Sequence, residues 1–208
     1  MSETRGLSMR STLRPAFALA LAATALLVGC GLDEVTPARV YVSSFEGGMD
    51  SWYANGTDVT NPPVNWNIQR AVDMSRDSIS SVRFQLDNSN GKGKIWMERA
   101  FSADSSGDYR VRVSYQFATR DYGTAGLWQI IAGAGPRAVS FPEELIYHAD
   151  TGNGSGSDVG YVWRYRDYTF DIRSSSTGKV FVSIGVWGTT LGARTYYVDQ
   201  VVVSLQKR

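Results

Sequence analysis

The chain has 208 residues, 43% of them hydrophobic, and a formal charge of +1 from 21 Lys and Arg against 20 Asp and Glu. This length and composition fit a globular domain with a full hydrophobic core and exclude a disordered chain. The near-neutral balance excludes the basic surface that nucleic-acid binding requires. A single histidine, His148, and a single cysteine, Cys30, exclude intrachain disulfides, cysteine-rich metal clusters and a redox metal cofactor.

The first segment, residues 1–29, has the pattern of a secretory signal. Basic residues precede an uncharged, mostly apolar run at 16–28. This run is shorter than the roughly 20 residues that a membrane-spanning helix needs. Both Met1 and Met9 remain open as the start, and Met9 gives a more ordinary signal length.

The apolar run ends in Leu-Val-Gly-Cys at residues 27–30. This ending resembles the lipobox of bacterial lipoproteins, in which the cysteine becomes the lipidated first residue. The resemblance implies a cleaved signal peptide over 1–29, acyl lipid such as palmitate on Cys30, and a lipidated tether over 30–39. Two or more acyl chains anchor a protein stably to a membrane. Gly31 in the following position favours the outer membrane or cell surface. The alternatives are an ordinary cleaved signal and a buried helix with a chance cysteine.

From Val40 onward, apolar and polar residues alternate, as in 82–87, 109–117 and 180–187. A period of two is typical of strands with one buried face. Strands are expected near 38–45, 65–71, 80–87, 94–102, 108–119, 126–133, 161–172, 179–187 and 195–205. The segment 142–148 is expected to form a short helix. About nine strands with few helices predict an all-β, antiparallel β-sandwich over residues 40–208.

Five segments carry a family resemblance. They are Ser-Phe-Glu-Gly-Gly-Met-Asp-Ser-Trp at 44–52, and the segments 107–116, 163–170, 178–184 and 196–205. Their order resembles the jelly-roll carbohydrate-binding modules of bacterial cellulases and xylanases, within the galactose-binding-like superfold. The resemblance implies a jelly-roll sandwich that binds glycan.

The resemblance also implies a structural calcium between the first and last strands. By motif position, its ligands would be Glu46, Asp77 and Asp199. Gln200 departs from the family pattern, because a second Asp often follows the first. The alternative is that these carboxylates accept hydrogen bonds from backbone N–H groups.

Sugar binding needs flat aromatic rings against the apolar face of the sugar and polar groups around its rim. Arg112 and Gln116 share one face of the strand expected at 108–119, and Trp128 lies in the next strand. Trp163 adds an aromatic face to the strand at 161–172. These four residues are the predicted ligand-binding set. The alternative for each tryptophan is packing in the core, and for Trp163 it is stacking against arginine.

Catalytic motifs are missing from the sequence. Glu143 and Glu144 are adjacent and would point apart, and His148 has no partner nucleophile in a recognisable motif. The sequence therefore predicts a non-catalytic, lipid-anchored cell-envelope protein that contacts the membrane through Cys30 and binds glycan. The alternative is a structural accessory subunit of a cell-surface or outer-membrane assembly, with a protein partner covering the aromatic face.

Overall fold

The computed structural model describes residues 38–208. The predicted signal segment 1–29 and the lipidation residue Cys30 lie outside the described residues. The described part forms one 3-10 turn, η1 (Pro142–Glu144), and eleven strands: β1 (Arg39–Ser43), β2 (Tyr53–Thr57), β3 (Trp66–Ala71), β4 (Ser81–Leu86), β5 (Lys94–Ser102), β6 (Asp108–Thr119), β7 (Gln129–Gly135), β8 (Tyr147–Asp150), β9 (Val162–Arg173), β10 (Lys179–Trp187) and β11 (Arg194–Lys207). Within this range, no helix has the length and apolar character to cross a membrane.

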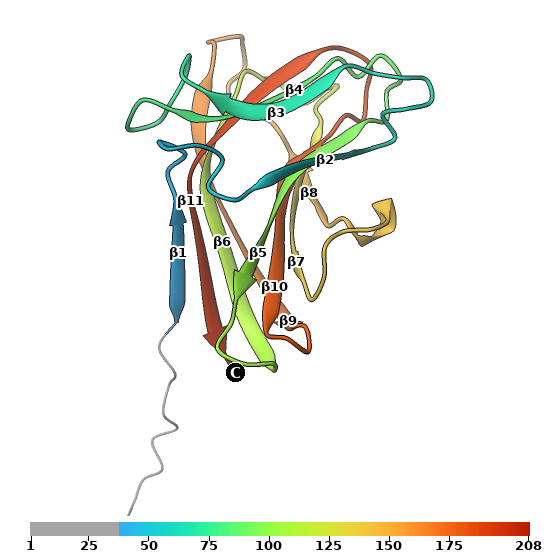
Figure 1. Ribbon diagram of the computed structural model, residues 1–208. Helices are drawn as coiled ribbons and strands as arrows, with labels where there is room; N and C mark the ends of the chain where they lie inside the picture. Colours follow the sequence, from blue (N-terminus) through green and yellow to red (C-terminus); the bar gives the residue numbers. More distant parts are fainter. Residues whose placement is uncertain (1–37) are drawn as a thin grey trace, which may run out of the picture. The chain divides into compact units, whose positions relative to one another are not determined.

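The strands pair into two antiparallel sheets, which confirms the predicted all-β sandwich (Figure 1). Sheet A has the order β3-β4-β11-β6-β9, and sheet B has the order β2-β5-β10-β7-β8. The remaining strand, β1, pairs with residues 201–205 of β11, whereas β4 pairs with Arg194–Val198. Since β6 takes the opposite edge of β11, β1 and β4 share one edge, on either side of a bulge between Asp199 and Val202.

Alternation along the strands decides which side chains enter the core. On β6, Tyr109, Val111 and Phe117 are buried between the sheets, while Arg110 and Arg112 are exposed. Burying one large apolar side chain contributes about 1.5–3 kcal/mol. The side chains that face inward therefore hold the sandwich together. The side chains that face outward are not part of this core, so their chemistry can differ between the two sheets.

The connection between β7 and β9 differs from its prediction. The helix expected over 142–148 is wrong, because only Pro142–Glu144 form a single turn and Tyr147–Asp150 form β8. Leu145 follows the turn with extended backbone and is buried against the outer face of sheet B. The packing of Leu145 against sheet B therefore favours an extended backbone here over the expected helix. The other unexpected strand, Tyr53–Thr57, lacks apolar alternation and forms the edge of sheet B beside β5.

Candidate functional site

The outer face of sheet B carries aromatic and polar side chains from neighbouring strands. Strand pairing places four residues in one row across β2, β5, β10 and β7: Tyr53, Glu98, Ser183 and Gly133. Side chains on one face of a strand recur every second residue, so Trp96 lies on the same face of β5 as Glu98. The row therefore brings a phenol, a carboxylate and a hydroxyl next to an indole.

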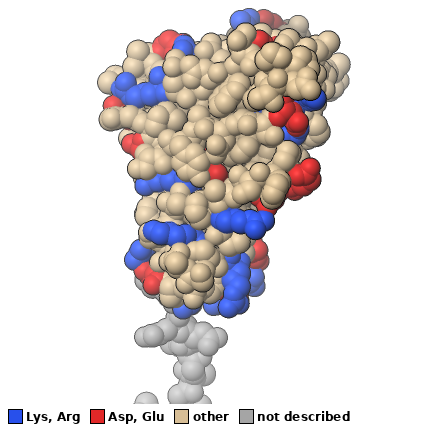
Figure 2. All heavy atoms as spheres, turned by 45° about the vertical axis from the view of Figure 1, so that its right-hand side comes forward, with Lys and Arg blue, Asp and Glu red and all other residues tan. Residues whose placement is uncertain are grey.

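The loop between β7 and β8 folds over this face. Val139 and Leu145 pack against Trp96 in a small apolar cluster outside the main core. At the start of β8, the ring of Tyr147 lies 4.8 Å from that of Trp187, measured between centroids. Figure 2 brings this side of the molecule forward and shows a largely uncharged surface with scattered acidic and basic groups. The loop thus forms one wall of the site.

A cavity of about 260 Å³, here named the sheet-B pocket, lies between the loop and the sheet. Its lining includes Glu98, Gly133, Arg137, Glu144, Phe181 and Ser183. A Cβ at Gly133 would lie 3.1 Å from Ser183 Oγ, so glycine keeps this part of the cavity open. Pockets for drug-sized ligands measure about 300–1,000 Å³. The smaller sheet-B pocket suits one ring of a ligand.

Glu98 is the buried acid of the pocket, with only 1% of its surface exposed. Its Oε2 accepts hydrogen bonds from Tyr53 Oη at 3.0 Å and Asn55 Nδ2 at 3.3 Å, and its Oε1 accepts one from Val139 N at 2.9 Å. Burial raises the pKa of Glu98 against the effect of these donors, and the negative charge of Glu144 adds to the rise. Burial and the neighbouring Glu98 raise the pKa of Tyr53 to about 12. Glu98 therefore joins β2 and the covering loop.

The charges at the mouth of the pocket neutralise each other. Glu144 forms an ion pair with Arg137 and accepts a hydrogen bond from Ser140 N at 2.8 Å. The Ser140 N–H and the Arg137 guanidinium lower the pKa of Glu144. The pocket thus offers the Phe181 ring, the Glu98 carboxylate and the Ser183 hydroxyl beside a paired rim. These groups match the apolar face and the hydroxyls of a sugar.

Trp128 is buried, which corrects its prediction as a ligand platform. Its side chain has no exposed surface and packs 5.8 Å from the Tyr196 ring, with the Arg194 guanidinium 5.3 Å from its ring centre. Around Trp128, the alternation of residues defines two faces without showing which of them is the core. Trp128 lies on the core side, so a sugar has no access to it.

Arg112, Gln116 and Trp163 do share one face, which is the outer face of sheet A. Arg112 is exposed and donates from Nε to Asp167 Oδ1 at 2.9 Å. Trp163 lies opposite Ala118 of β6 and is half-buried against it. These three residues lie on the other sheet from the sheet-B pocket, and their role in ligand binding stays a prediction.

The predicted calcium ligands Glu46, Asp77 and Asp199 influence one another at the bulge of β11. Burial raises the pKa of Asp199, and the negative charges of Asp77 and Glu46 raise it further. Asp199 accepts hydrogen bonds from the backbone N–H groups of Arg76 at 2.8 Å and Gln200 at 2.7 Å, one on each carboxylate oxygen. Both oxygens therefore already have a protein donor.

Arg70 supplies a cation beside Glu46. Its guanidinium donates from Nε to the Phe45 carbonyl at 2.7 Å and from Nη2 to the Glu46 carbonyl at 2.9 Å. The Glu46 side chain accepts from Ser80 N at 3.2 Å and Ser80 Oγ at 3.1 Å. Calcium takes about six to eight oxygen ligands, and over residues 38–208 no group of three or more His, Cys, Asp or Glu is placed to hold a metal ion. This arrangement does not fit calcium, whose binding stays a prediction for the experiment below.

Comparisons with known proteins bear on the fold. No protein-family model matches the sequence, and no curated protein matches it. The K3 cleaved adhesin domain of Lys-gingipain from Porphyromonas gingivalis is 14% identical, with a TM-score of 0.50, covering 81% of this chain and 99% of that one. The CBM22-1 xylan-binding domain of Paenibacillus barcinonensis Xyn10C is 14% identical, with a TM-score of 0.47, covering 81% of this chain and 94% of that one.

A third structure, of carbohydrate-binding modules from the β-sandwich superfamily, is 13% identical, with a TM-score of 0.43 over 76% of this chain. This chain spans only 59% of that one. The described domain is an antiparallel β-sandwich, and the adhesin domain above has a similar fold. Identities this low show a shared fold, and ligands must be argued from the site itself.

Proposed function

We propose that this protein is a non-catalytic, lipid-anchored protein of the cell envelope that binds glycan in the sheet-B pocket. The observation that carries the proposal is a cavity for one ring, which lies under the covering loop and is lined by Glu98, Phe181 and Ser183. The partly exposed ring of Tyr53 lies next to Glu98 on the neighbouring strand. Aromatic rings cover the apolar face of a sugar at low entropic cost, and the polar groups bind its hydroxyls. The resemblance of five sequence segments to jelly-roll carbohydrate-binding modules supports the same interpretation.

The anchor rests on the sequence Leu-Val-Gly-Cys at residues 27–30. A tether of about nine residues spans at most about 30 Å when fully extended, so the domain would work close to the outer membrane or cell surface. The test is labelling with radioactive palmitate in a bacterial host. The label should enter the wild-type chain and be absent from Cys30→Ser, which should leave the membrane fraction. A labelled Cys30→Ser chain would contradict the anchor.

The test of glycan binding uses the full-length lipoprotein purified in detergent. A glycan array identifies the ligand class, and isothermal titration measures its affinity. Tyr53→Ala removes a ring that is 42% exposed beside Glu98. We expect it to weaken binding about tenfold or more, which corresponds to about 1.4 kcal/mol.

Tyr165→Ala is the matched control, because Tyr165 is 57% exposed on the outer face of sheet A. This variant should bind as the wild type does, and the bound glycan should be recovered uncleaved. An array with no bound glycan, or an equal loss in both variants, would contradict the proposal. Co-purification with a stoichiometric envelope protein in that case would favour the accessory-subunit alternative.

A further inference from the structure

Six basic side chains surround one end of the sandwich, where β1 begins and β11 ends. They come from both sheets and are named here the basic end: Arg39, Arg110, Arg173, Lys179, Lys207 and Arg208. Strand pairing places the ends of β1, β11, β6 and β9 side by side, and β10 begins beside the end of β5. Arg39 joins the two sheets, since its Nη1 donates to the Ser102 carbonyl at 3.2 Å. Figure 2 shows Lys and Arg side chains gathered over the lower part of the domain, the end at which Figure 1 marks the end of β11.

The basic end carries more positive charge than its own carboxylates neutralise. It is formed by the segments 38–40, 102–110, 171–179 and 205–208, which hold six Lys and Arg against three Asp. The rest of 38–208 holds 12 Lys and Arg against 14 Asp and Glu. The described domain is therefore nearly neutral as a whole, but its charge is unevenly distributed, and the positive excess lies at this end.

Two features leave cations of the basic end available to a ligand. Arg110 and Arg208 share one carboxylate, because Arg110 Nε lies 3.0 Å from Asp171 Oδ1 and Arg208 Nη1 lies 2.8 Å from Asp171 Oδ2. Lys179 and Lys207 each donate from Nζ to the hydroxyl of a neighbouring serine, at 2.7 Å and 2.9 Å. A hydroxyl carries no charge, so both ammonium groups keep their full positive charge towards an anion.

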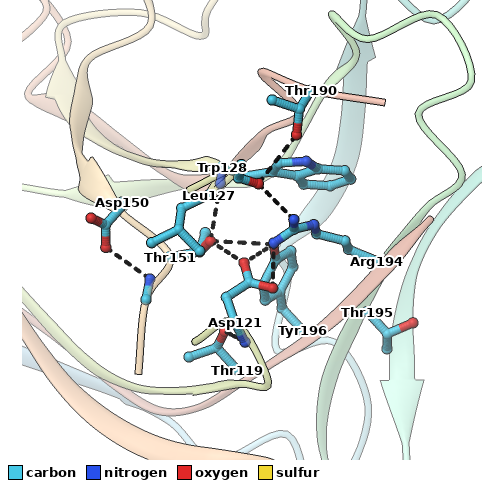
Figure 3. A network of polar contacts seen from close by, with 12 residues as sticks. Thr119, Asp121, Leu127, Trp128, Asp150, Thr151, Thr190, Arg194, Thr195 and Tyr196 are labelled. Atoms are coloured by element: carbon cyan, nitrogen blue, oxygen red, sulfur yellow. Dashed lines mark hydrogen bonds and ion pairs between the residues drawn. The ribbon is translucent and has the colours of Figure 1, made fainter. Parts of the chain in front are cut away.

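The opposite end of β6 holds its charges differently. There Arg194 forms an ion pair with Asp121 and donates from Nη2 to the Gly126 carbonyl at 2.6 Å (Figure 3). Asp121 also accepts a hydrogen bond from Tyr196 Oη at 2.7 Å. An anion that approached Arg194 would have to compete with this carboxylate. An anionic surface is therefore attracted to the basic end rather than to this one.

The sequence connects the basic end to the predicted lipid. Cys30 lies nine residues before Arg39, the first residue of β1. A tether of this length spans at most about 30 Å, so acyl chains on Cys30 would keep the basic end close to the bilayer. Anionic headgroups attract Lys and Arg that come within a Debye length of about 10 Å. An acidic partner that is free in solution lacks this link, which favours the membrane itself as the partner.

We propose that the basic end docks on the anionic phospholipid headgroups of the leaflet that holds the acyl chains. The docking orients the sandwich with this end against the bilayer and the loop between β6 and β7 away from it. This proposal rests on the proposed anchor at Cys30, which brings the charges within range, but it does not depend on glycan binding. The acyl chains hold the protein on the membrane, and the basic end decides how it stands there.

The test reconstitutes the full-length lipoprotein in phosphatidylcholine vesicles, with or without about one third phosphatidylglycerol. All vesicles contain a lipid with a nitroxide on its headgroup, which quenches a nearby fluorophore. Cys30 is the only cysteine of the chain and is acylated in the proposed anchor, so an introduced cysteine gives a single thiol for labelling. Ser176→Cys places the label in the loop between β9 and β10 at the basic end, and Thr124→Cys places it beyond the opposite end of β6.

The label at Ser176 should be quenched more strongly when phosphatidylglycerol is present, and about 0.5 M salt should remove the difference. The label at Thr124 should not respond to the lipid charge. Lys179→Gln with Lys207→Gln should lower the ratio of docked to undocked domains at least tenfold, because each basic residue near the surface adds to the attraction. Thermal unfolding checks that every variant is folded.

Lys92→Gln with Arg120→Gln is the matched control. It removes the same charge at the opposite end, since Lys92 precedes β5 and Arg120 follows β6, and it should dock as the wild type does. Equal quenching at Ser176 in both kinds of vesicle, or an equal loss in both double variants, would overturn the proposal.

Flotation of the vesicles separates the docking from the anchor. Acyl chains should carry the protein with both kinds of vesicle, whatever the lipid charge. Flotation with the anionic vesicles alone would contradict the anchor and support the docking. A protein that floats with neither kind would overturn both proposals.

Discussion

Alternating side chains form the outer faces of both sheets, but the carboxylates on the two faces differ in burial and in the groups that bind them. On sheet A, Asp167 is paired with Arg112 and Asp171 with Arg110, in open contact with water. The arginines lower the pKa of both aspartates. On sheet B, Glu98 is buried under a loop and bound by uncharged donors, and its pKa is raised. The comparison shows that the covering loop, rather than the strand pattern, decides the chemistry of a face.

The largest expected effect is on stability, from Glu98→Ala. This change removes a buried carboxylate that accepts hydrogen bonds from Tyr53, Asn55 and Val139. Leaving buried donors unsatisfied costs about 1–3 kcal/mol for each group that water cannot reach. We expect the free energy of unfolding, measured in urea, to fall by about 3 kcal/mol in total.

Asp167→Ala is the matched change on sheet A. Exposed ion pairs contribute little because water and salt screen them. The urea midpoint of this variant should therefore stay close to that of the wild type. A larger loss for Asp167→Ala than for Glu98→Ala would reverse the comparison between the two faces.

A second test concerns the bulge of β11, where charge is buried within sheet A. Arg70→Met removes the donors to the Phe45 and Glu46 carbonyls. We expect a loss of about 2 kcal/mol, which lowers the Tm by about 4–8 °C for a domain of this size. Arg112→Met, on the exposed face, should leave the Tm almost unchanged.

The same measurement tests the predicted calcium. A ligand at 100 times its Kd stabilises the folded state by about 2.7 kcal/mol. The carboxylate oxygens of Asp199 already accept from backbone N–H groups, and the Glu46 carboxylate accepts from Ser80. Neither EDTA nor added calcium should therefore move the Tm of the wild type. A rise of several degrees with calcium would show that the ion binds after all.

The sequence predicts which side chains share a face of a strand, but not which residues of other strands and loops they contact. The alternation of Tyr109 to Phe117 identified the core side of β6 correctly. The alternation of Trp96 and Glu98 within 94–102 also placed an indole and a carboxylate on one face, a signal that the prediction did not use. Their partners Tyr53 and Val139 depend on strand register and on a loop about 40 residues away in sequence. Period two carries no information on such contacts, and for the same reason it left Trp128 ambiguous.

A third, smaller effect is a difference in pH dependence between the faces. The raised pKa of Glu98 means that the folded state takes up a proton at a higher pH than the unfolded chain. As the pH falls from 7 towards the ordinary Glu value of about 4.3, the unfolding free energy of the wild type should rise relative to that of Glu98→Gln. Urea titrations at several pH values measure this difference.

Asp167 should show the opposite sign in a lower pH range. Its lowered pKa gives stability that is present above the ordinary Asp value of about 3.9 and is lost as the pH falls further. The wild type should therefore lose stability relative to Asp167→Asn only below about pH 4. A common sign for both faces would contradict the assignment of a buried acid to sheet B.

The smallest expected effect comes from Gly133→Ala in the sheet-B pocket. This variant tests whether glycan affinity can fall while the stability of the domain stays almost unchanged. Gly133→Ala places a Cβ 3.1 Å from Ser183 Oγ and 3.5 Å from Ile146 Cδ1, at the wall of the cavity. The nearest atoms are side-chain atoms that can shift, so the Tm should change little. A sugar in the pocket loses the same space, and its affinity should fall by a few-fold. If Gly133→Ala leaves glycan affinity unchanged while Tyr53→Ala abolishes it, the ligand lies on the edge strand β2 rather than inside the cavity.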